Sequence, residues 1–214
     1  MKFSEQVKFY FKGSLTVPNL LSFLRIVMVP VFAVLFLREE YAWSVLVLAL
    51  SGITDFLDGK IARRFNQISN LGKMLDPLAD KLTQITIAIV FFITFRKAQD
   101  SLISAFSYVF LVFLIKEAVM VLGSVAMIVL GLRPGAAEMP GKVATFAFYF
   151  IMISIIAFGP EIGVLGKYFT YPAPVMVALI VISAILCIVA FCSYIPGIKQ
   201  QLREKKENKS KESK

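Results

Sequence analysis

Long apolar stretches separated by short polar loops run along most of the chain. Six of them have about 20 mostly apolar residues, enough to cross the roughly 30 Å hydrocarbon core of a bilayer as helices. They cover approximately residues 18–38, 42–58, 74–95, 101–131, 142–160 and 173–196. The pattern therefore predicts an all-α integral membrane protein with six transmembrane helices.

The two ends of the chain differ from these spans. Aromatic and aliphatic side chains of residues 1–17 repeat at helical spacing with lysines between them, which predicts an N-terminal amphipathic helix lying in the membrane interface. Residues 18–198 hold the six spans and form one membrane domain. Residues 199–214 alternate Lys and Glu, and we interpret them as a basic cytosolic tail.

Positive charge is distributed unevenly between the two sides that this topology defines. The side that holds both termini has sixteen Lys and Arg, whereas the opposite side has four: Arg38, Arg96, Lys97 and Lys167. Cytoplasmic loops are enriched in Lys and Arg, so both termini are predicted to be cytosolic. The expected location is the cell (inner, cytoplasmic) membrane.

Composition narrows the chemistry further. Hydrophobic residues make up 58% of the 214 residues, charged residues only 17%, and there is no histidine. A catalytic triad with histidine and a histidine-ligated metal are therefore excluded. The net charge of +9 follows the membrane topology, so we expect a membrane lipid surface and no nucleic acid as its partner.

Four of the fourteen acidic residues crowd into the window 55–80. Asp55 and Asp58 are three residues apart and share a helix face at the cytosolic end of the second span. Asp76 and Asp80 are four apart and share a face at the start of the third span. A hairpin joins the two helices, so all four carboxylates are predicted to converge near the inner interface, where ionisable residues by default mark a functional site.

Four converging anions need cations between them. Oxygen ligands alone select hard ions, and two divalent ions such as Mg²⁺ or Mn²⁺ match four carboxylates and the chemistry of phosphoryl displacement. Gly59 and Gly72 leave room for a substrate, Ala62 keeps the next turn small, and Arg63 suits a phosphate. The alternative is that these acids only cap helices, which does not account for all four spacings.

The string Asp-x2-Asp-Gly-x2-Ala-Arg-x8-Gly-x3-Asp-x3-Asp, which begins at Asp55, resembles the signature of the CDP-alcohol phosphotransferase family. Six spans are similar to the topology of that family. Pro18, Asn19, Leu20 and Arg25 of the first span resemble the opening of its phosphatidylglycerophosphate synthase and cardiolipin synthase branches.

The resemblance implies an enzyme of phospholipid biosynthesis that transfers the phosphatidyl group of CDP-diacylglycerol to an alcohol and releases CMP. It implies that Asp55, Asp58, Asp76 and Asp80 hold two divalent cations, Mg²⁺ or Mn²⁺, and that Asp80 is also the catalytic base. The cytidine diphosphate would be bound by Asp58, Gly59, Ala62, Arg63 and Gly72. The active site would face the cytosol, and the resemblance also implies a homodimer.

The fourth and fifth spans are expected to bind the acceptor. Lys116, Arg133 and Lys142 are the candidate acceptor-binding residues, although the arginines typical of glycerol-3-phosphate users are missing at two positions. The main hypothesis is glycerol-3-phosphate as acceptor, which gives phosphatidylglycerophosphate. The alternative is a cardiolipin synthase that uses phosphatidylglycerol, since a free phosphate monoester needs more cationic donors.

Three further points stay open in the sequence. Arg25 reaches either the inner interface or the substrate diphosphate. Lys116 either binds the acceptor or is neutralised by Glu117, and Lys81 is expected to pair with acidic residues at the cytosolic rim. A divalent-cation transporter is a different class of function, which would spread its acids through the bilayer depth and show inverted repeats.

Overall fold

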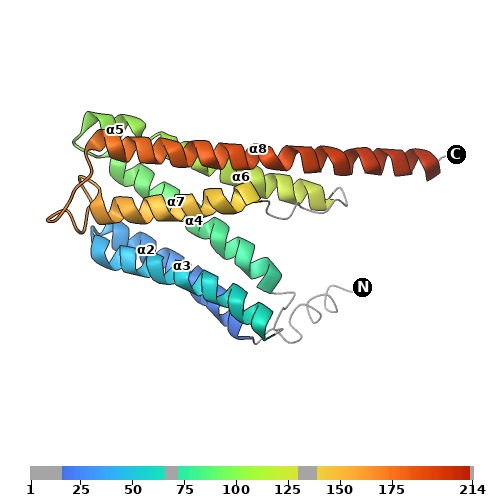
Figure 1. Ribbon diagram of the computed structural model, residues 1–214, viewed down its shortest axis with the longest axis horizontal. Coiled ribbons are helices and arrows are strands. Elements are labelled where there is room, and N and C mark those ends of the chain that lie inside the picture. The colour runs from blue at the N-terminus through green and yellow to red at the C-terminus, as the bar shows by residue number, and fades with distance from the viewer. Residues whose placement is uncertain (1–15, 66–71, 130–138, 213–214) are drawn as a thin grey trace.

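The protein is a bundle of long helices that alternate in direction (Figure 1). The computed structural model describes residues 16–65, 72–129 and 139–212, and this part of the chain is helical with no strand. The helices are α2 (Val17–Leu37), α3 (Tyr41–Arg64), α4 (Gly72–Arg96), α5 (Ser101–Phe106), α6 (Val109–Val129), α7 (Met139–Phe158) and α8 (Ala173–Glu212).

Five helical segments are long and apolar enough to span a membrane. They are Val17–Leu37, Leu75–Arg96, Ser101–Met127, Met139–Phe158 and Ala173–Arg203. The second predicted span, 42–58, is the exception, because the apolar part of α3 is the shorter stretch Tyr41–Asp55. Those fifteen residues rise about 22 Å, less than the bilayer core. The charged end of α3 therefore lies at the depth of a membrane edge if α3 crosses with the others.

The fourth predicted span, 101–131, also differs from expectation in detail. It is divided into α5 and α6 by a turn at Ser107 and Tyr108, whose carbonyls accept from the N–H groups of Phe110 and Leu111, three residues later. No proline or glycine marks this break in the sequence. The prediction of an all-helical membrane protein is confirmed by the elements and their apolar lengths.

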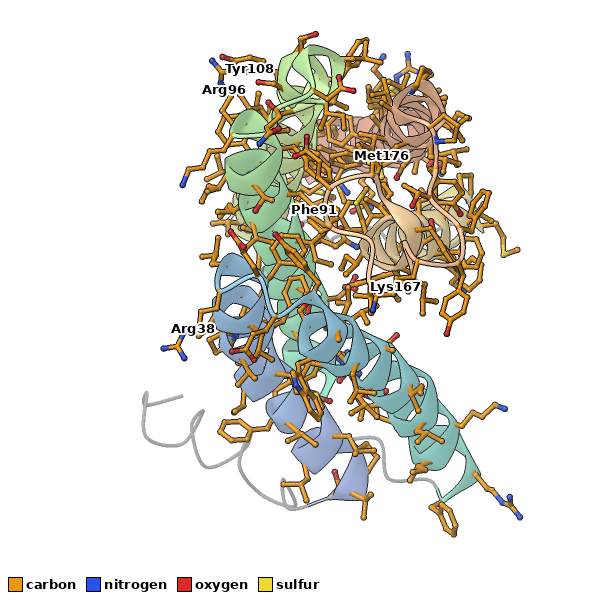
Figure 2. All side chains as sticks on the ribbon, turned by 90° about the vertical axis from the view of Figure 1, so that its left-hand side faces the viewer. Arg38, Phe91, Arg96, Tyr108, Lys167 and Met176 are labelled. Carbon is orange, nitrogen blue, oxygen red and sulfur yellow. The ribbon has the colours of Figure 1, made fainter. Side chains whose placement is uncertain are left out.

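The ends of the helices divide into two groups. The start of α2, the end of α3, the start of α4 and the end of α8 lie at one end of the bundle, and α8 extends beyond the other helices there (Figure 1). The opposite end contains Arg38, Arg96 and Lys167 (Figure 2), which belong to the few cations predicted to be outside. Arg96 lies over the ring of Tyr108, 5.1 Å from its centroid.

The N-terminal segment 1–17 lies outside the described residues except for its last two positions. At the other end of the chain, α8 continues without a break from the predicted membrane domain into the predicted basic tail, 199–214. Pro196 lies inside this helix, at the boundary between its apolar and its charged part.

An aromatic core holds the helices together at the end remote from Asp55, Asp58, Asp76 and Asp80. Phe36 of α2, Phe91 of α4 and Phe110 of α6 are completely buried. The ring centroids of Phe36 and Phe91 are 5.0 Å apart, and those of Phe91 and Phe110 are 5.4 Å apart. Such offset and tilted ring pairs are favourable beyond the area that they bury. Phe91 lies at the centre of this end of the bundle (Figure 2).

The outward faces of the helices are also apolar. Trp43, Leu122, Phe146 and many other large hydrophobic side chains are exposed on the isolated protein. Exposed apolar surface of this extent marks contact with lipid or another protein. Together with the helix lengths, it identifies an integral membrane protein.

The start of α7 approaches α8 closely. A Cβ atom at Gly141 would lie 2.6 Å from the hydroxyl of Tyr194. Any larger residue there would have to displace Tyr194 or the helix, so glycine permits this packing.

Candidate active site

Helix α2 lies at the centre of the end of the molecule that holds the four predicted site aspartates. It packs against both α3 and α4, which make little direct contact with each other. Its side chains at one face are buried: Pro18, Asn19, Ser22, Arg25, Val29, Phe32 and Phe36. The helix is started by Thr16, whose hydroxyl accepts a hydrogen bond from the backbone N–H of Asn19, and by proline in the first turn.

Arg25 binds both acids of α3. Its Nη1 lies 2.7 Å from Oδ1 of Asp55, and its Nη2 donates to Oδ2 of Asp58 in a second ion pair. The side chains of Arg25 and Asp58 are only 3% and 5% exposed, whereas that of Asp55 is 60% exposed. The contact with Asp55 is an ion pair without hydrogen-bond alignment, and Nε has no hydrogen-bond partner among the described residues. One guanidinium is thus shared by two carboxylates and offsets one of their two negative charges.

Ser22, one turn before Arg25 on the same face, reaches the other acidic helix. Its hydroxyl lies 2.5 Å from Oδ1 of Asp76 and 3.0 Å from the carbonyl oxygen of Pro18. The hydroxyl has one proton to donate and the carboxylate is the stronger acceptor, so we assign the proton to the shorter contact with Asp76. Ser22 is fully buried, so this contact orients the carboxylate.

Asp80 is held from α7. The hydroxyl of Tyr149 donates to Oδ1 of Asp80 at 3.1 Å. Asp80 is half-buried, and it lies within electrostatic range of Asp55. A phenol that donates to one carboxylate oxygen fixes the orientation of the other, which leaves Asp80 able to accept a proton from a substrate.

A second charged group lies next to these acids. The carboxylate of Glu117 on α6 is 2% exposed and forms ion pairs with Lys81 of α4 and Lys116 of α6. The prediction that Lys81 pairs with acidic residues is confirmed. Lys116 also pairs with Glu117, whose single negative charge it shares with Lys81.

The four aspartates do not form one cage in this arrangement. Among the residues that the structure describes, no group of three or more acidic or cysteine side chains is close enough to hold a metal ion. The predicted site of four carboxylates stays a prediction. Arg25 of α2 contacts the two acids of α3 and Ser22 contacts Asp76 of α4, while Asp80 lies within electrostatic range of Asp55.

The donor chemistry of the acids still fits a divalent cation. Asp55 and Asp58 share one cation already, the guanidinium of Arg25, which shows that both carboxylates reach a common position. All ligands available are oxygens, which suits Mg²⁺ or Mn²⁺. Asp76 and Asp80 lie one turn apart at the start of α4.

The remaining predicted site residues are less fully described. Gly59, Ala62 and Arg63 lie in α3, but the details of their side-chain positions fall outside the described part, and Arg133 lies outside it altogether. Gly72 is buried at the start of α4. Lys142 is exposed in the first turn of α7.

Two residues of the site were missed by the sequence reasoning, and one was left unassigned. Ser22 and Arg25 lie three residues apart on a helix that is otherwise almost entirely apolar, in phase with Val29, Phe32 and Phe36. That phase is a signal for a polar buried patch. Tyr149 gives no such signal, because an aromatic residue in an apolar span is ordinary.

Comparison with known proteins agrees with the motif. Residues 15–193 match the family described as CDP-alcohol phosphatidyltransferase. A cardiolipin synthase (CMP-forming) from Streptomyces coelicolor is 39% identical over 150 residues, which are 65% of this chain and 66% of that protein. A CDP-diacylglycerol–glycerol-3-phosphate 3-phosphatidyltransferase from Aquifex aeolicus is 27% identical over 192 residues, 89% of this chain and 100% of the relative.

Other relatives match over shorter stretches. A putative cardiolipin synthase from Mycobacterium tuberculosis is 47% identical over 78 residues, 36% of this chain and 37% of that protein. The chain thus spans just under two thirds of the Streptomyces relative and little more than a third of the mycobacterial one. The names of the relatives include both acceptor reactions that the sequence left open.

Proposed function

Because this chain belongs to the CDP-alcohol phosphatidyltransferase family, we propose that it transfers the phosphatidyl group of CDP-diacylglycerol to an alcohol and releases CMP. The observation that carries the proposal is the set of four aspartates at adjoining helix ends, each oriented by a partner on a neighbouring helix. The family match also favours an enzyme over the alternative of a divalent-cation transporter.

The reaction exchanges one phosphorus–oxygen bond for another. The hydroxyl oxygen of the acceptor attacks the phosphorus that bears the diacylglycerol, and the bond from that phosphorus to the oxygen of CMP breaks. The hydroxyl proton passes to a base, and CMP leaves with the electron pair of the broken bond. Phosphatidyl transfer therefore needs a base beside the acceptor and positive charge beside the leaving CMP.

Asp80 is the base in this proposal. Its Oδ1 accepts the hydrogen bond from Tyr149, so Oδ2 is the oxygen left for the hydroxyl proton of the acceptor. A carboxylate must serve here because the chain has no histidine. Tyr149 keeps the carboxylate in one orientation, which favours proton transfer to a positioned hydroxyl.

Asp55, Asp58, Asp76 and Asp80 are the residues that would hold divalent cations, Mg²⁺ or Mn²⁺. Bound ions would supply the positive charge that the diphosphate and the departing CMP require. The support is the oxygen-only donor set and the sharing of one cation by Asp55 and Asp58. Asp58 with Gly59, Ala62, Arg63 and Gly72 would seat the cytidine diphosphate.

Phosphatidylglycerol is the acceptor that the geometry favours, which would make the protein a cardiolipin synthase. The observation is that Lys81 and Lys116 both pair with Glu117, which reduces the positive charge available to a free phosphate monoester. Glycerol-3-phosphate, the first hypothesis from the sequence, remains the second candidate. It is favoured by the relative from Aquifex aeolicus, which aligns over its whole length.

The membrane arrangement completes the proposal. In this proposal the chain crosses the membrane six times, α3 is the pass whose charged end reaches the membrane edge, and both termini are cytosolic, so the acids would lie beside the inner leaflet. The asymmetry of Lys and Arg between the two ends supports this orientation in the cytoplasmic membrane. The exposed apolar faces leave room for a homodimer.

An acceptor screen tests the function. Purified protein is supplied with CDP-diacylglycerol and Mn²⁺, and separately with phosphatidylglycerol, glycerol-3-phosphate, serine and inositol phosphate. CMP release is measured and lipid products are identified by mass. We expect cardiolipin from phosphatidylglycerol and no turnover after EDTA. Phosphatidylglycerophosphate as sole product would establish the second candidate, and no CMP release with any acceptor would refute the proposal.

A further inference from the structure

We propose that Arg25 is the built-in counter-ion of this site, which offsets one of the two negative charges of Asp55 and Asp58 before a divalent cation binds and then competes with that cation for them. The inference rests on the proposed function, because it concerns the same carboxylates. It assigns a role to a residue for which the sequence allowed two others.

Burial is the first argument. Ionised side chains are strongly disfavoured away from water unless they are paired, and a guanidinium carries a full positive charge. With its side chain 3% exposed, Arg25 needs carboxylates beside it. Asp58, at 5% exposed, needs a cation for the same reason. In the absence of any other cation, the two residues stabilise each other's charge.

The geometry is the second argument. Each terminal nitrogen of Arg25 faces a different carboxylate, Nη1 that of Asp55 and Nη2 that of Asp58. The guanidinium therefore occupies the region between two acids that lie one helical turn apart. These are the two acids most directly placed to share a single ion.

Competition follows from charge and space. A divalent ion binds carboxylate oxygens at about 2.0–2.6 Å, closer than an ion-paired nitrogen. Two cations that face the same oxygens also repel each other. Binding of a divalent ion to Asp55 and Asp58 therefore requires Arg25 to withdraw from at least one of them. We expect the contact with Asp55 to break first, because the Asp55 side chain is 60% exposed and its contact with Arg25 lacks hydrogen-bond alignment.

The alternative is that Arg25 is a permanent brace, which holds the carboxylates in position while an ion binds to their other oxygens. The two roles predict opposite effects of removing the guanidinium. A competitor lowers the apparent affinity for the ion, so its removal strengthens ion binding. A brace improves the affinity, so its removal weakens ion binding.

Binding of Mn²⁺ to the detergent-solubilised full chain distinguishes the two roles without any lipid substrate. Free Mn²⁺ is measured by electron paramagnetic resonance during a titration of the wild type, Arg25→Gln, Arg25→Lys and the control Arg64→Gln. Arg64 is exposed at the end of the same helix that holds Asp55 and Asp58, so its variant removes one positive charge without touching these ion pairs.

We expect Arg25→Gln to bind Mn²⁺ at least about tenfold more tightly than the wild type, since a unit positive charge next to the ligands is lost. Arg25→Lys should lie between them, because an ammonium contacts the acids at one point only. Arg64→Gln should stay within about twofold, since its charge is screened by solvent. Thermal unfolding should show that Mn²⁺ stabilises Arg25→Gln more than the wild type.

The other outcomes also decide. Equal or weaker Mn²⁺ binding by Arg25→Gln, with binding by the wild type intact, would overturn the competition and leave the proposed function standing. Absence of Mn²⁺ binding in both proteins would overturn the competition together with the assigned cation role of the aspartates. If Arg25→Gln does not fold, Arg25→Lys decides, and binding no tighter than that of the wild type would count against the inference.

Discussion

The two halves of the buried face of α2 contact the same two neighbouring helices with opposite chemistry. In the first half, Arg25 contacts the acids of α3 and Ser22 contacts Asp76 of α4. In the second half, the ring of Phe36 packs against those of Tyr41 on α3 and Phe91 on α4, with ring centroids 5.2 Å and 5.0 Å apart. One helix thus joins the same partners first by charge and then by aromatic packing.

The difference separates stability from activity along a single helix. Aromatic packing depends on volume, and a cavity there costs free energy of unfolding in proportion to its size. A polar contact is worth less on balance, but it fixes the position of an individual oxygen atom. The first half should therefore control catalysis and ion binding, and the second half should control how firmly the bundle holds together.

The largest expected effect is that of Asp58→Asn in the polar half. The amide keeps the size of the side chain but removes the charge that faces Arg25 and, in our proposal, a cation. We expect CMP release to fall about a thousandfold, as for loss of a charged group that acts in the transition state. The assay uses the monodisperse fraction of protein, since breaking a buried ion pair also lowers stability.

Asp100→Asn is the matched control for this variant. Asp100 caps the N-terminus of α5 at the other end of the bundle, where its carboxylate accepts from the N–H groups of Leu102 and Ile103. Asparagine caps helices equally well, so turnover should be unchanged. Turnover by Asp58→Asn equal to that of Asp100→Asn would contradict the assigned role of Asp58.

In the apolar half, Phe91→Ala should have the largest effect on stability. Phe91 is completely buried and packs against the rings of Phe36, Phe95 and Phe110. We expect a loss of about 3 kcal/mol in the free energy of unfolding, from the cavity left among these rings. Unfolding in detergent measures it, and turnover per folded molecule should change little.

Phe146→Ala makes the same chemical change at a side chain that is 72% exposed. It leaves no internal cavity, so its stability should stay within about 0.5 kcal/mol of the wild type. A loss as large as that of Phe91→Ala would show that the face around Phe146 is packed against another subunit and not against lipid.

Some parts of the fold could be predicted from the sequence and others could not. The apolar run predicted at 142–160 is the helix Met139–Phe158, because length and hydropathy alone determine a spanning helix. The division of the run 101–131 at Ser107 could not be predicted, since no glycine or proline marks the turn of the backbone there. The predicted span 42–58 extends beyond the apolar part of α3, Tyr41–Asp55, because the charged end continues the same helix.

For the candidate site, the sequence predicted only the relative positions of residues within one helix. The spacing of Asp55 with Asp58 places them one turn apart, and this is confirmed by their shared contact with Arg25. The hydrogen-bond partners on other helices could not be predicted, because Ser22 is 54 residues from Asp76 and Tyr149 is 69 residues from Asp80 in the sequence. A periodic pattern gives the face of a helix but not the neighbour that the face meets.

Tyr149→Phe tests one of these long-range contacts. It removes only the hydroxyl that donates to Asp80. We expect kcat to fall about tenfold with KM little changed, since a base that rotates freely is less often in position, while stability falls by about 1 kcal/mol. Tyr168→Phe, at a tyrosine 88% exposed, is the control and should match the wild type. An unchanged kcat in Tyr149→Phe would show that Asp80 needs no orientation from α7.

The smallest effect is expected from Ser22→Ala, and it bears most directly on the comparison. Ser22 and Ser124 both lie in long apolar helices, and each hydroxyl lies near the carbonyl four residues earlier, at 3.0 Å from Pro18 and 2.8 Å from Met120. Only Ser22 also contacts a carboxylate, that of Asp76. Ser22→Ala should therefore lower the free energy of unfolding by about 1 kcal/mol more than Ser124→Ala. This difference is slightly less than the typical net contribution of a hydrogen bond to a charged group.

The free energies of unfolding of the two variants are measured under identical conditions and subtracted. The subtraction removes the effect that both variants share, which is the loss of a hydroxyl and of its contact with a carbonyl in the same helix. The remaining difference measures the contact of α2 with Asp76 alone. The difference should shrink when Mn²⁺ is present, if an ion then takes over the negative charge of Asp76. Equal losses in both variants, with and without Mn²⁺, would mean that the polar half of α2 does not hold the acids of α4, and the contrast with the aromatic half would then be confined to Arg25 and α3.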